Sequence, residues 1–511
     1  MAFKAKTREE WIKYGKNAWK KWRYAIMAVL VYIAFAAYYM GPSITACTDT
    51  VYGFGDNTAG PIWKYSLPGG QSPIGGFEDY TNHPYGENLY TPVTVSNVLQ
   101  STVLWGFAKV AGPVCGYNLM NLTGFVVSAA GMFGFIYWLT RNRWIALLAG
   151  YVVSFTPYFQ YKVGGHPSYG YHVLLIGTVW LFFKLLKERR KRDAVFLGLV
   201  AGACFSWDPY FTLLMVSTLI PLGIAWLLYG WWSVRKATNP AQKNVKAAFV
   251  QQAKLLGISA AIIAVFMMPL VAVRISMSSQ INNYVSGSRG NVMQDAMYCS
   301  ILPWDHVLPA DDNWFIGKFV APSFSEKMRV FRHQCNPSEY NVGLSAAVLA
   351  VISLGLVIFI WEKVNGRRLF ARKGVDHDYR FVMFALAAMI IFAAALAMPP
   401  TLGKLKFPFY YLLQLTDTWR IPNRLYLVIN IGMTVLFAIV LTYAAQLKFF
   451  AGRKWRSIVA LLLVFALIFA QYQAFAPLHG SRATFSYSKD MSQIYSWLKD
   501  QKDIHYIAAY P

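Results

Sequence analysis

Charged residues are scarce in this sequence of 511 residues, and acids are the scarcer kind. Asp, Glu, Lys and Arg make up 14% of the chain, whereas soluble domains carry about 25%. Hydrophobic residues make up 56% and aromatic residues 17%. This composition excludes an ordinary soluble protein and predicts an integral membrane protein with many spans.

Cysteine is also scarce, and none of the five cysteines has a spacing that suits zinc. A small-residue cleavage site is missing after the basic N-terminal segment, so we expect the first apolar run to remain as an anchor. Two cysteine pairs could form disulfides in an oxidising compartment, Cys47 with Cys115 and Cys299 with Cys335. Sequence alone does not determine either pairing.

Long apolar runs predict an all-α membrane protein with eleven transmembrane helices. Several runs are shorter than the roughly 20 residues of a perpendicular crossing, which suggests helices broken where they line a cavity. Ser96–Ala111 is helix-like but holds Gln100 and Lys109, so it is expected to lie flat at the interface. The predicted spans are Tyr24–Met40, Leu119–Leu139, Trp144–Tyr158, Val173–Leu186, Ala194–Trp207, Phe211–Trp232, Leu255–Val273, Val342–Trp361, Phe381–Met398, Leu425–Gln446 and Ser457–Phe475.

The positive charge predicts the orientation of these spans. With the N-terminus in the cytoplasm, the segments on that side hold 31 of the 48 Lys and Arg residues and only 7 acids. The exterior segments then hold 17 basic residues and 16 acids. Because the net charge of +25 falls almost wholly inside, it indicates an N-in, C-out topology and not a nucleic-acid partner.

This topology divides the chain into three parts. Residues 1–23 are a basic, Trp-containing segment expected to lie on anionic headgroups in the cytoplasm. Residues 24–475 are the polytopic domain, with exterior loops 41–116, 274–341 and 399–424. Residues 476–511 are an exterior tail in which MSQIYSWLKDQKD indicates a helix and HYIAAYP a strand. We interpret the tail as the start of a truncated α/β domain, with edge packing as the alternative.

The first exterior loop is the main candidate for chemistry. The stretch Cys47–Tyr90 is rich in glycine and proline and holds five of the 23 acids, namely Asp49, Asp56, Glu78, Asp79 and Glu87. Asp56 lies in GDNTAGPIW, just before Trp63. A carboxylate near the membrane can have a raised pKa and act as a general base. The alternative role of Asp56 is that of a turn residue.

Three further segments hold candidates on the exterior side. Asp208, in SWDPYF, is either a functional acid or an N-cap. His166, in YKVGGHPSYGYH, could bind a metal or a phosphate, or could be a hydrogen-bonding loop residue. Both are expected to rim a cavity with Asp56. Arg420 and Arg424, in DTWRIPNRLYLV, are four residues apart and would share a helical face that suits a phosphate; interfacial snorkelling is the alternative.

Several segments together resemble the GT-C-type polytopic membrane glycosyltransferases and their uncharacterised bacterial relatives. The resemblance covers roughly residues 20–480. It begins with a basic head, one span, and a long exterior loop with GD followed by aromatics. The other segments are HPYGENL, YKVGGHPSYGYHVLL, WDPYF, SEYNVGLSAAVLAV and PPTLGKLKFPFYYLLQLTDTWRIPNRL, which ends in an Arg-x-Pro-x-Arg pattern.

The resemblance implies transfer of a sugar from a polyprenyl-phosphate donor to a glycan, lipid or protein acceptor, on the exterior face of a cell membrane. Asp56 would be the base, with Asp49 in reserve, and Arg420 and Arg424 would hold the donor phosphate with His166 beside them. The first-loop site lacks an adjacent acid pair, since Glu78-Asp79 lies later and is expected at the cavity rim with Asp208. A need for Mg²⁺ or Mn²⁺ therefore stays open, and no cofactor is assigned.

Two other functions are compatible with the sequence. A flippase or transporter of lipid-linked glycans would require ionisable residues in mid-span. The predicted spans hold almost none apart from Lys184 near a cytoplasmic end, which counts against an ion-coupled carrier. A non-catalytic subunit of an envelope assembly would keep the scaffold without the activity. Asp56→Asn separates this second function from an enzyme, because only an enzyme would lose turnover.

Overall fold

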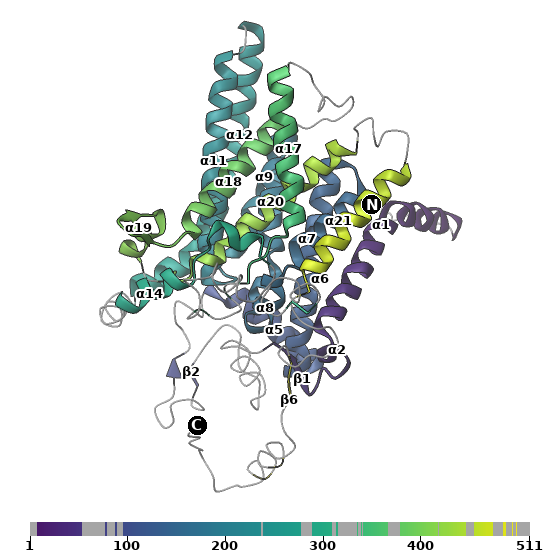
Figure 1. Cartoon of the computed structure of the whole chain (residues 1–511), viewed down its shortest axis with the longest axis vertical. Helices are drawn as coiled ribbons and strands as arrows, with labels where there is room; N and C mark the ends of the chain where they lie inside the picture. The colour runs from purple at the N-terminus through teal and green to yellow at the C-terminus, as the bar shows by residue number, and fades with distance from the viewer. Residues whose placement is uncertain are drawn as a thin grey trace, which may run out of the picture.

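The computed structural model shows a bundle of long helices (Figure 1). It describes residues 8–53, 77–78, 87–88, 96–236, 239–276, 289–308, 313–314, 335, 339, 341–365, 379–416, 418–445, 454–473, 484–486, 493 and 497.

A helix lies in each of the eleven apolar runs. Seven helices of the described chain are long and apolar enough to cross a membrane, and three shorter ones are also apolar. The chain is thus a mainly helical, multi-pass membrane protein, while the count of eleven crossings and their orientation stay predictions. The described helices of twelve residues or more, which include α5 and α10 beside those ten, are α1 (Arg8–Met40), α5 (Val98–Ala111), α6 (Pro113–Thr140), α7 (Arg143–Ser154), α9 (Val173–Glu188), α10 (Lys191–Cys204), α11 (Pro209–Lys236), α12 (Asn239–Ser276), α17 (Ala346–Asn365), α18 (Tyr379–Ala397), α20 (Tyr426–Ala444) and α21 (Lys454–Gln471).

Proline decides where several helices begin. Proline opens α6 and α11, the short helices α8 (Pro157–Gly165) and α19 (Pro408–Leu415), and the 3₁₀ turns η1 (Pro167–Tyr171) and η3 (Pro422–Leu425). Its fixed φ suits the first helical position, where no backbone N–H is needed. The predicted span Trp144–Tyr158 is therefore wrong at its end, because α7 stops at Ser154 and Pro157 starts α8.

The most buried and the most exposed of the long helices differ sharply. Of the apolar stretch in α20, 78% is buried inside the protein, against 6% of that in α12. The core around α1, α6 and α7 is aromatic: the Phe125 and Phe155 rings stack with their centroids 5.5 Å apart. The Tyr39 and Tyr151 hydroxyls bond at 2.7 Å. An exposed apolar helix such as α12 is expected to face lipid.

The two ends of the bundle carry different structures (Figure 1). The α11–α12 pair extends to one end. The opposite end holds α5, α8, the short helix α2 (Pro42–Thr45) and the strand β1 (Thr50–Tyr52). The start of the first exterior loop, up to Gly53, and the Gly-rich segment with His166 thus lie at the same end.

Three two-stranded antiparallel pairings occur among the described residues. β1 pairs with β6 (Thr484–Ser486), β2 (Phe77–Glu78) with β3 (Glu87–Asn88), and β4 (Thr401–Leu402) with β5 (Leu405–Lys406). The first pairing joins the start of the acidic loop to the C-terminal tail. The helix and strand predicted at the end of the tail lie outside the described residues, apart from Gln493 and Trp497, which are helical.

Candidate functional site

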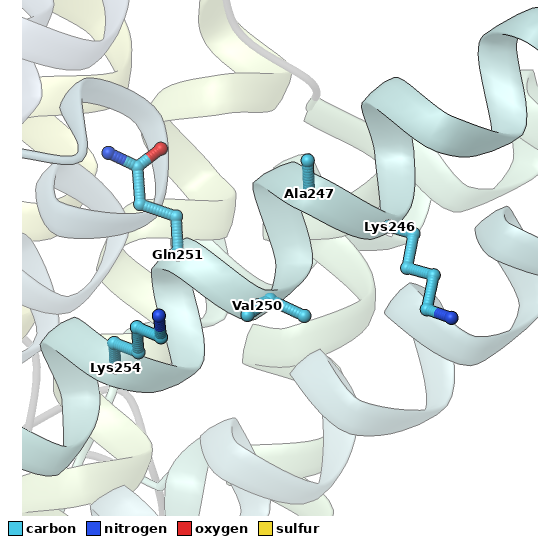
Figure 2. A pocket seen from close by; sticks show the side chains of 5 residues that line it. All are labelled: Lys246, Ala247, Val250, Gln251 and Lys254. Atoms are coloured by element: carbon cyan, nitrogen blue, oxygen red, sulfur yellow. The ribbon is translucent and has the colours of Figure 1, made fainter.

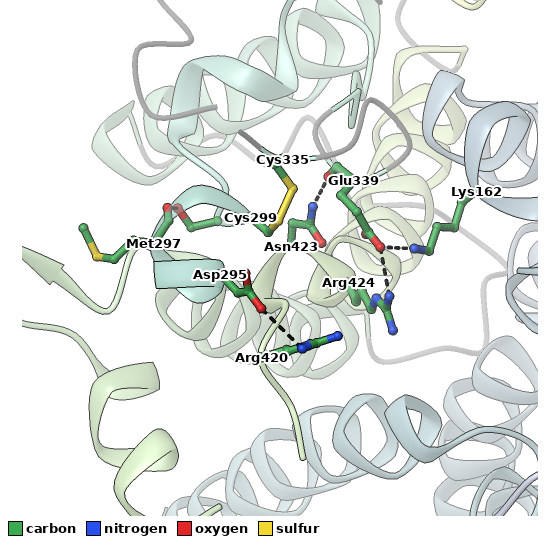
Figure 3. Close-up of a disulfide and its surroundings, with 10 residues drawn as sticks. Lys162, Asp295, Met297, Cys299, Cys335, Glu339, Arg420, Asn423 and Arg424 are labelled. Atoms are coloured by element: carbon green, nitrogen blue, oxygen red, sulfur yellow. Dashed lines mark hydrogen bonds and ion pairs between the residues drawn. A yellow bond between two sulfur atoms is a disulfide. The ribbon is translucent and has the colours of Figure 1, made fainter. Parts of the chain in front are cut away.

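A buried carboxylate shared by two cations forms the centre of the candidate site. Glu339 Oε1 accepts hydrogen bonds from Lys162 Nζ and from Arg424 Nη2, the second at 2.9 Å (Figure 3). The side chains of Lys162, Glu339 and Arg424 are 0%, 6% and 9% exposed. Charges this deeply buried are unusual unless they are paired, so this cluster is structurally constrained.

The three charged residues come from distant parts of the chain, and a disulfide anchors the part that carries Glu339. Lys162 lies on α8, Glu339 follows Cys335 by four residues, and Arg424 lies in η3. Cys335 is bonded to Cys299, directly after the helix α14 (Arg289–Tyr298). Asn423 then joins both sides, because its backbone N donates to Cys299 O at 3.0 Å and its side chain donates to Glu339 O. The structure also bonds Cys47 to Cys115, so both bridges are those that the sequence suggests.

Aromatic rings and a second acid surround the cluster. The Arg424 guanidinium lies 3.9 Å from the Tyr210 ring centroid, and Lys162 Nζ lies 5.3 Å from that of Tyr169. Asp208 accepts from Ser168 Oγ at 2.8 Å and from the Tyr210 backbone N at 2.8 Å. Asp208 therefore caps the start of α11, as its alternative role required, and lies beside the cluster as well.

Burial and neighbouring charges change the protonation of the acids and bases. Burial would raise the pKa of Glu339, but the Arg424 and Lys162 charges outweigh it and lower this pKa well below its usual range, so Glu339 is ionised. Burial and the Arg424 charge lower the pKa of Lys162, against the attraction of Glu339. Burial raises the pKa of Asp208, although Arg424 and Ser168 oppose the change.

His166 follows α8 at the edge of the cluster and is neutral there. Burial and the charges of Lys162 and Arg424 lower its pKa to about 2. Its backbone N donates to Lys162 O at 2.8 Å. A neutral imidazole can donate one hydrogen bond and accept another, but it adds no positive charge for a phosphate.

Several buried polar atoms of the cluster have no hydrogen-bond partner among the described residues. These atoms are Glu339 Oε2, Arg424 Nε, Asn423 Oδ1 and the Tyr169 hydroxyl. Buried polar groups are nearly always satisfied by protein, water or ligand. Their concentration around one ion-pair cluster indicates a place where a polar ligand could bind.

The first exterior loop starts directly against this site. Gly53 has φ 78° and packs against Gly164 so closely that a Cβ on Gly53 would lie 2.2 Å from Gly164 Cα. Gly164 stands between Lys162 and His166 on α8. Hydrogen bonds from Tyr52 N to Asn118 Oδ1 at 2.8 Å and from Tyr117 O–H to Gly164 O at 2.8 Å hold the contact. Only glycine permits this approach, so the loop leaves the bundle beside the cluster.

The structure brings together some of the sequence candidates and separates others. Arg424, His166 and Asp208 meet around Glu339. Arg420 does not join them: its side chain is 57% exposed and pairs with Asp295 at 3.4 Å. The shared helical face expected for the two arginines is wrong, because Arg420 and Ile421 precede η3.

The acids of the first loop are only partly described. Asp49 is exposed, directly before β1. Asp56 and Asp79 lie outside the described residues, and Glu78 is described only through the backbone of β2. Within the described part of the chain, no three His, Cys, Asp or Glu side chains are grouped to hold a metal ion. Glu339 in particular does not fit a divalent cation, since two cations already share its oxygen.

Sequence reasoning missed Lys162 and Glu339 as functional candidates. Both stand in segments that carry the family resemblance, YKVGGHPSYGYH and SEYNVGL. The available signal was a lysine in a Gly- and aromatic-rich segment and a glutamate ahead of an apolar run. Their partnership could not be detected, because 177 residues separate them.

No protein-family model matches this sequence, and a search of curated proteins finds no significant match. Among solved structures, the chain is similar to the crystal structure of the Archaeoglobus fulgidus oligosaccharyltransferase in complex with zinc and sulfate, with 13% identity and a TM-score of 0.45. The match covers 93% of this chain and 56% of the archaeal chain, so the chain spans little more than half of that protein. A TM-score below 0.5 does not establish a shared activity.

Proposed function

We propose that this protein is a membrane glycosyltransferase that moves a sugar from a polyprenyl-phosphate donor to an acceptor on the exterior face. In this proposal the cluster of Lys162, Glu339 and Arg424 binds the donor phosphate. A carboxylate of the first exterior loop, Asp56 with Asp49 in reserve, acts as the general base.

The observation that carries the proposal is the pair of buried cations with unsatisfied polar atoms beside them. Arg424 can offer a planar fork to a phosphate, and its Nε is still without a described partner. Lys162 and Arg424 would offset the negative charge that develops on the leaving phosphate. The segments that form the cluster are the ones that resemble the glycosyltransferases, namely YKVGGHPSYGYH, WDPYF, SEYN and RIPNR.

The cluster changes which residues the proposal assigns to the phosphate. Lys162 replaces Arg420 as the partner of Arg424, because Arg420 is exposed and paired with Asp295. His166 is neutral, so it would donate a hydrogen bond and not a charge. Asp208 accepts hydrogen bonds from Ser168 and the Tyr210 backbone. It would therefore position the segment whose Tyr210 ring contacts Arg424.

The general base is proposed from its closeness in sequence to a residue that packs at the cluster. Asp56 is three residues beyond Gly53, which packs against Gly164 between Lys162 and His166. The base must deprotonate the acceptor hydroxyl as the phosphate leaves. The loop that carries Asp56 therefore starts beside the cations that would hold the donor phosphate.

The test is transfer of radiolabelled sugar by purified protein in detergent, supplied with polyprenyl-phosphate sugars as donors and with glycan, lipid and protein acceptors. Asp56→Asn should abolish turnover yet keep donor binding, because Lys162 and Arg424, which would bind the donor phosphate, are unchanged. Lys162→Gln should weaken donor binding. Asp49→Asn is the matched control, an acid-to-amide change seven residues earlier on the same loop, and should stay active.

Two results would overturn parts of the proposal. Activity lost in Asp49→Asn but kept in Asp56→Asn would move the base to Asp49. Absence of transfer by folded wild-type protein with every donor sugar would refute the enzyme function and favour a transporter or an assembly subunit.

A further inference from the structure

An exposed basic stripe runs along one face of α12, the helix that packs against α11. Lys246, Val250, Lys254 and Ile258 follow at intervals of four residues, and all four side chains are exposed. Such spacing places them on one helical face, about 6 Å apart along the axis. Figure 2 shows Lys246 and Lys254 on either side of Val250, along an open groove of about 470 Å³ that Ala247 and Gln251 also line.

The segment of chain that carries this stripe is positive. From Arg235 to Lys254 the sequence contains no Asp or Glu, but it contains five basic residues. These are Arg235, Lys236, Lys243, Lys246 and Lys254. A groove with two lysines and no acid on its own helix is complementary to an anion.

Aromatic residues on α11 indicate the depth of the stripe in a membrane. Trp231 and Trp232 are 54% and 49% exposed, and Arg235 lies 3.9 Å from the Trp231 ring centroid. Phe249 on α12 stacks on Trp226 with centroids 4.6 Å apart, which sets the two helices side by side at this level. Exposed Trp beside basic residues is typical of the interface between headgroups and acyl chains.

The same face of α12 continues as an apolar surface. Ile258, Val265 and Met268 are 37%, 62% and 66% exposed. Lys246 and Lys254 are separated by about 12 Å along the helix axis, and their long stems can bring both ammonium groups toward one headgroup. A charged head at the groove and an apolar chain below it match the two halves of a lipid.

We propose that this stripe binds an anionic phospholipid, with the lipid phosphate between Lys246 and Lys254 and an acyl chain along Ile258 and Val265. This site is separate from the donor site, since it lies on a different helix and does not depend on transfer. The loop 235–254 is predicted to be cytoplasmic, so the lipid would come from the inner leaflet, where anionic headgroups attract basic segments.

The experiment is native mass spectrometry of the full chain released from phosphatidylcholine nanodiscs that contain phosphatidylglycerol. Wild type should retain phosphatidylglycerol in preference to phosphatidylcholine. Each Lys→Gln change should weaken its retention about fivefold, and K246Q/K254Q together by more than either alone. K246R/K254R, which keeps both charges, should retain the lipid, because the proposal depends on positive charge at these positions.

The matched control is K404Q/K406Q, which removes two exposed lysines from the β4–β5 hairpin, and it should leave retention unchanged. Inorganic phosphate at millimolar concentration should not displace the lipid, because it lacks the acyl chain. Equal retention in wild type and K246Q/K254Q would overturn the proposal. Displacement by inorganic phosphate would overturn it as well, in favour of a free-anion site.

Discussion

Arg424 and Arg420 stand four residues apart in one motif and lie in opposite electrostatic settings. The Arg424 side chain is 9% exposed and shares Glu339 with Lys162. The Arg420 side chain is 57% exposed and meets Asp295, itself 44% exposed, at 3.4 Å (Figure 3). The two arginines would be interchangeable in a sequence pattern, but only one is held in place by burial.

This difference determines how much each ion pair can contribute. An exposed pair is screened by water and salt, and typically contributes about 0–1 kcal/mol. A buried pair is costly to form, but removing one partner leaves an uncompensated charge, at a cost of about 3–5 kcal/mol. The contrast between the two arginines therefore makes quantitative predictions.

The two largest effects are expected at the buried cluster, and the first is that of Arg424→Ala. The change leaves Glu339 with Lys162 alone and removes the contact with the Tyr210 ring, so it should lower the free energy of unfolding by about 3 kcal/mol. Thermal unfolding in detergent measures this loss. Arg424→Lys keeps the charge and should lose less. A shift no larger than that of Arg420→Ala would contradict the importance of burial.

An equally large loss, about 3 kcal/mol, is expected for Glu339→Gln. The amide leaves Lys162 and Arg424 as two buried cations without a counter-charge. Added sulfate or inorganic phosphate should therefore raise the melting temperature of this variant more than that of wild type. Asp295→Asn, which affects only the exposed pair, is the control. Equal effects of the anion on Glu339→Gln and wild type would exclude an anion site at the cluster.

Donor binding is expected to weaken as the pH rises, because Lys162 loses its proton. Its lowered pKa means that it loses its proton at a lower pH than an ordinary lysine, and the neutral amine no longer attracts a phosphate. Above this pKa, each pH unit should weaken binding by up to about tenfold. Lys162→Arg keeps its charge throughout, so its binding should stay level in titrations between about pH 6 and 9. If donor binding by wild type and by Lys162→Arg depended on pH in the same way, Lys162 would not be part of the donor site.

The smallest effect is expected for Arg420→Ala. Because its ion pair with Asp295 is exposed, the stability loss should be about 0.5 kcal/mol and should shrink further in high salt. A double-mutant cycle with Asp295→Ala measures the coupling directly. A coupling above about 2 kcal/mol would show that this pair is shielded as Arg424 is.

The positions of the helices were largely predictable, and the ends of some were not. Long apolar runs mark their own helices, as in α6, α11 and α20. The break between α7 and α8 depends on Pro157, which stands inside an apolar run and so was included in it. Fold class was thus available from composition, whereas the helix that carries Lys162 was not.

The candidate site was predictable only in fragments. Arg424, His166 and Asp208 were identified one by one from local chemistry, and the interpretation of Asp208 as an N-cap agrees with its bond to the Tyr210 backbone. Pairing Arg424 with Arg420 failed, because the helical spacing that this pairing assumed applies only within a helix. Glu339 was absent from the candidates, since its only local signal, a place ahead of an apolar run, does not reveal that it is buried between two cations.

What the sequence determined by itself is a membrane-embedded helical chain, because apolar runs can bury their backbone polar groups in lipid only as helices. Its charge distribution also predicts which loops stay in the cytoplasm. Only the tertiary structure decided that Lys162, Glu339 and Arg424 meet. A buried ion pair depends on distance and on exclusion of water, and both arise when helices far apart in the chain pack together.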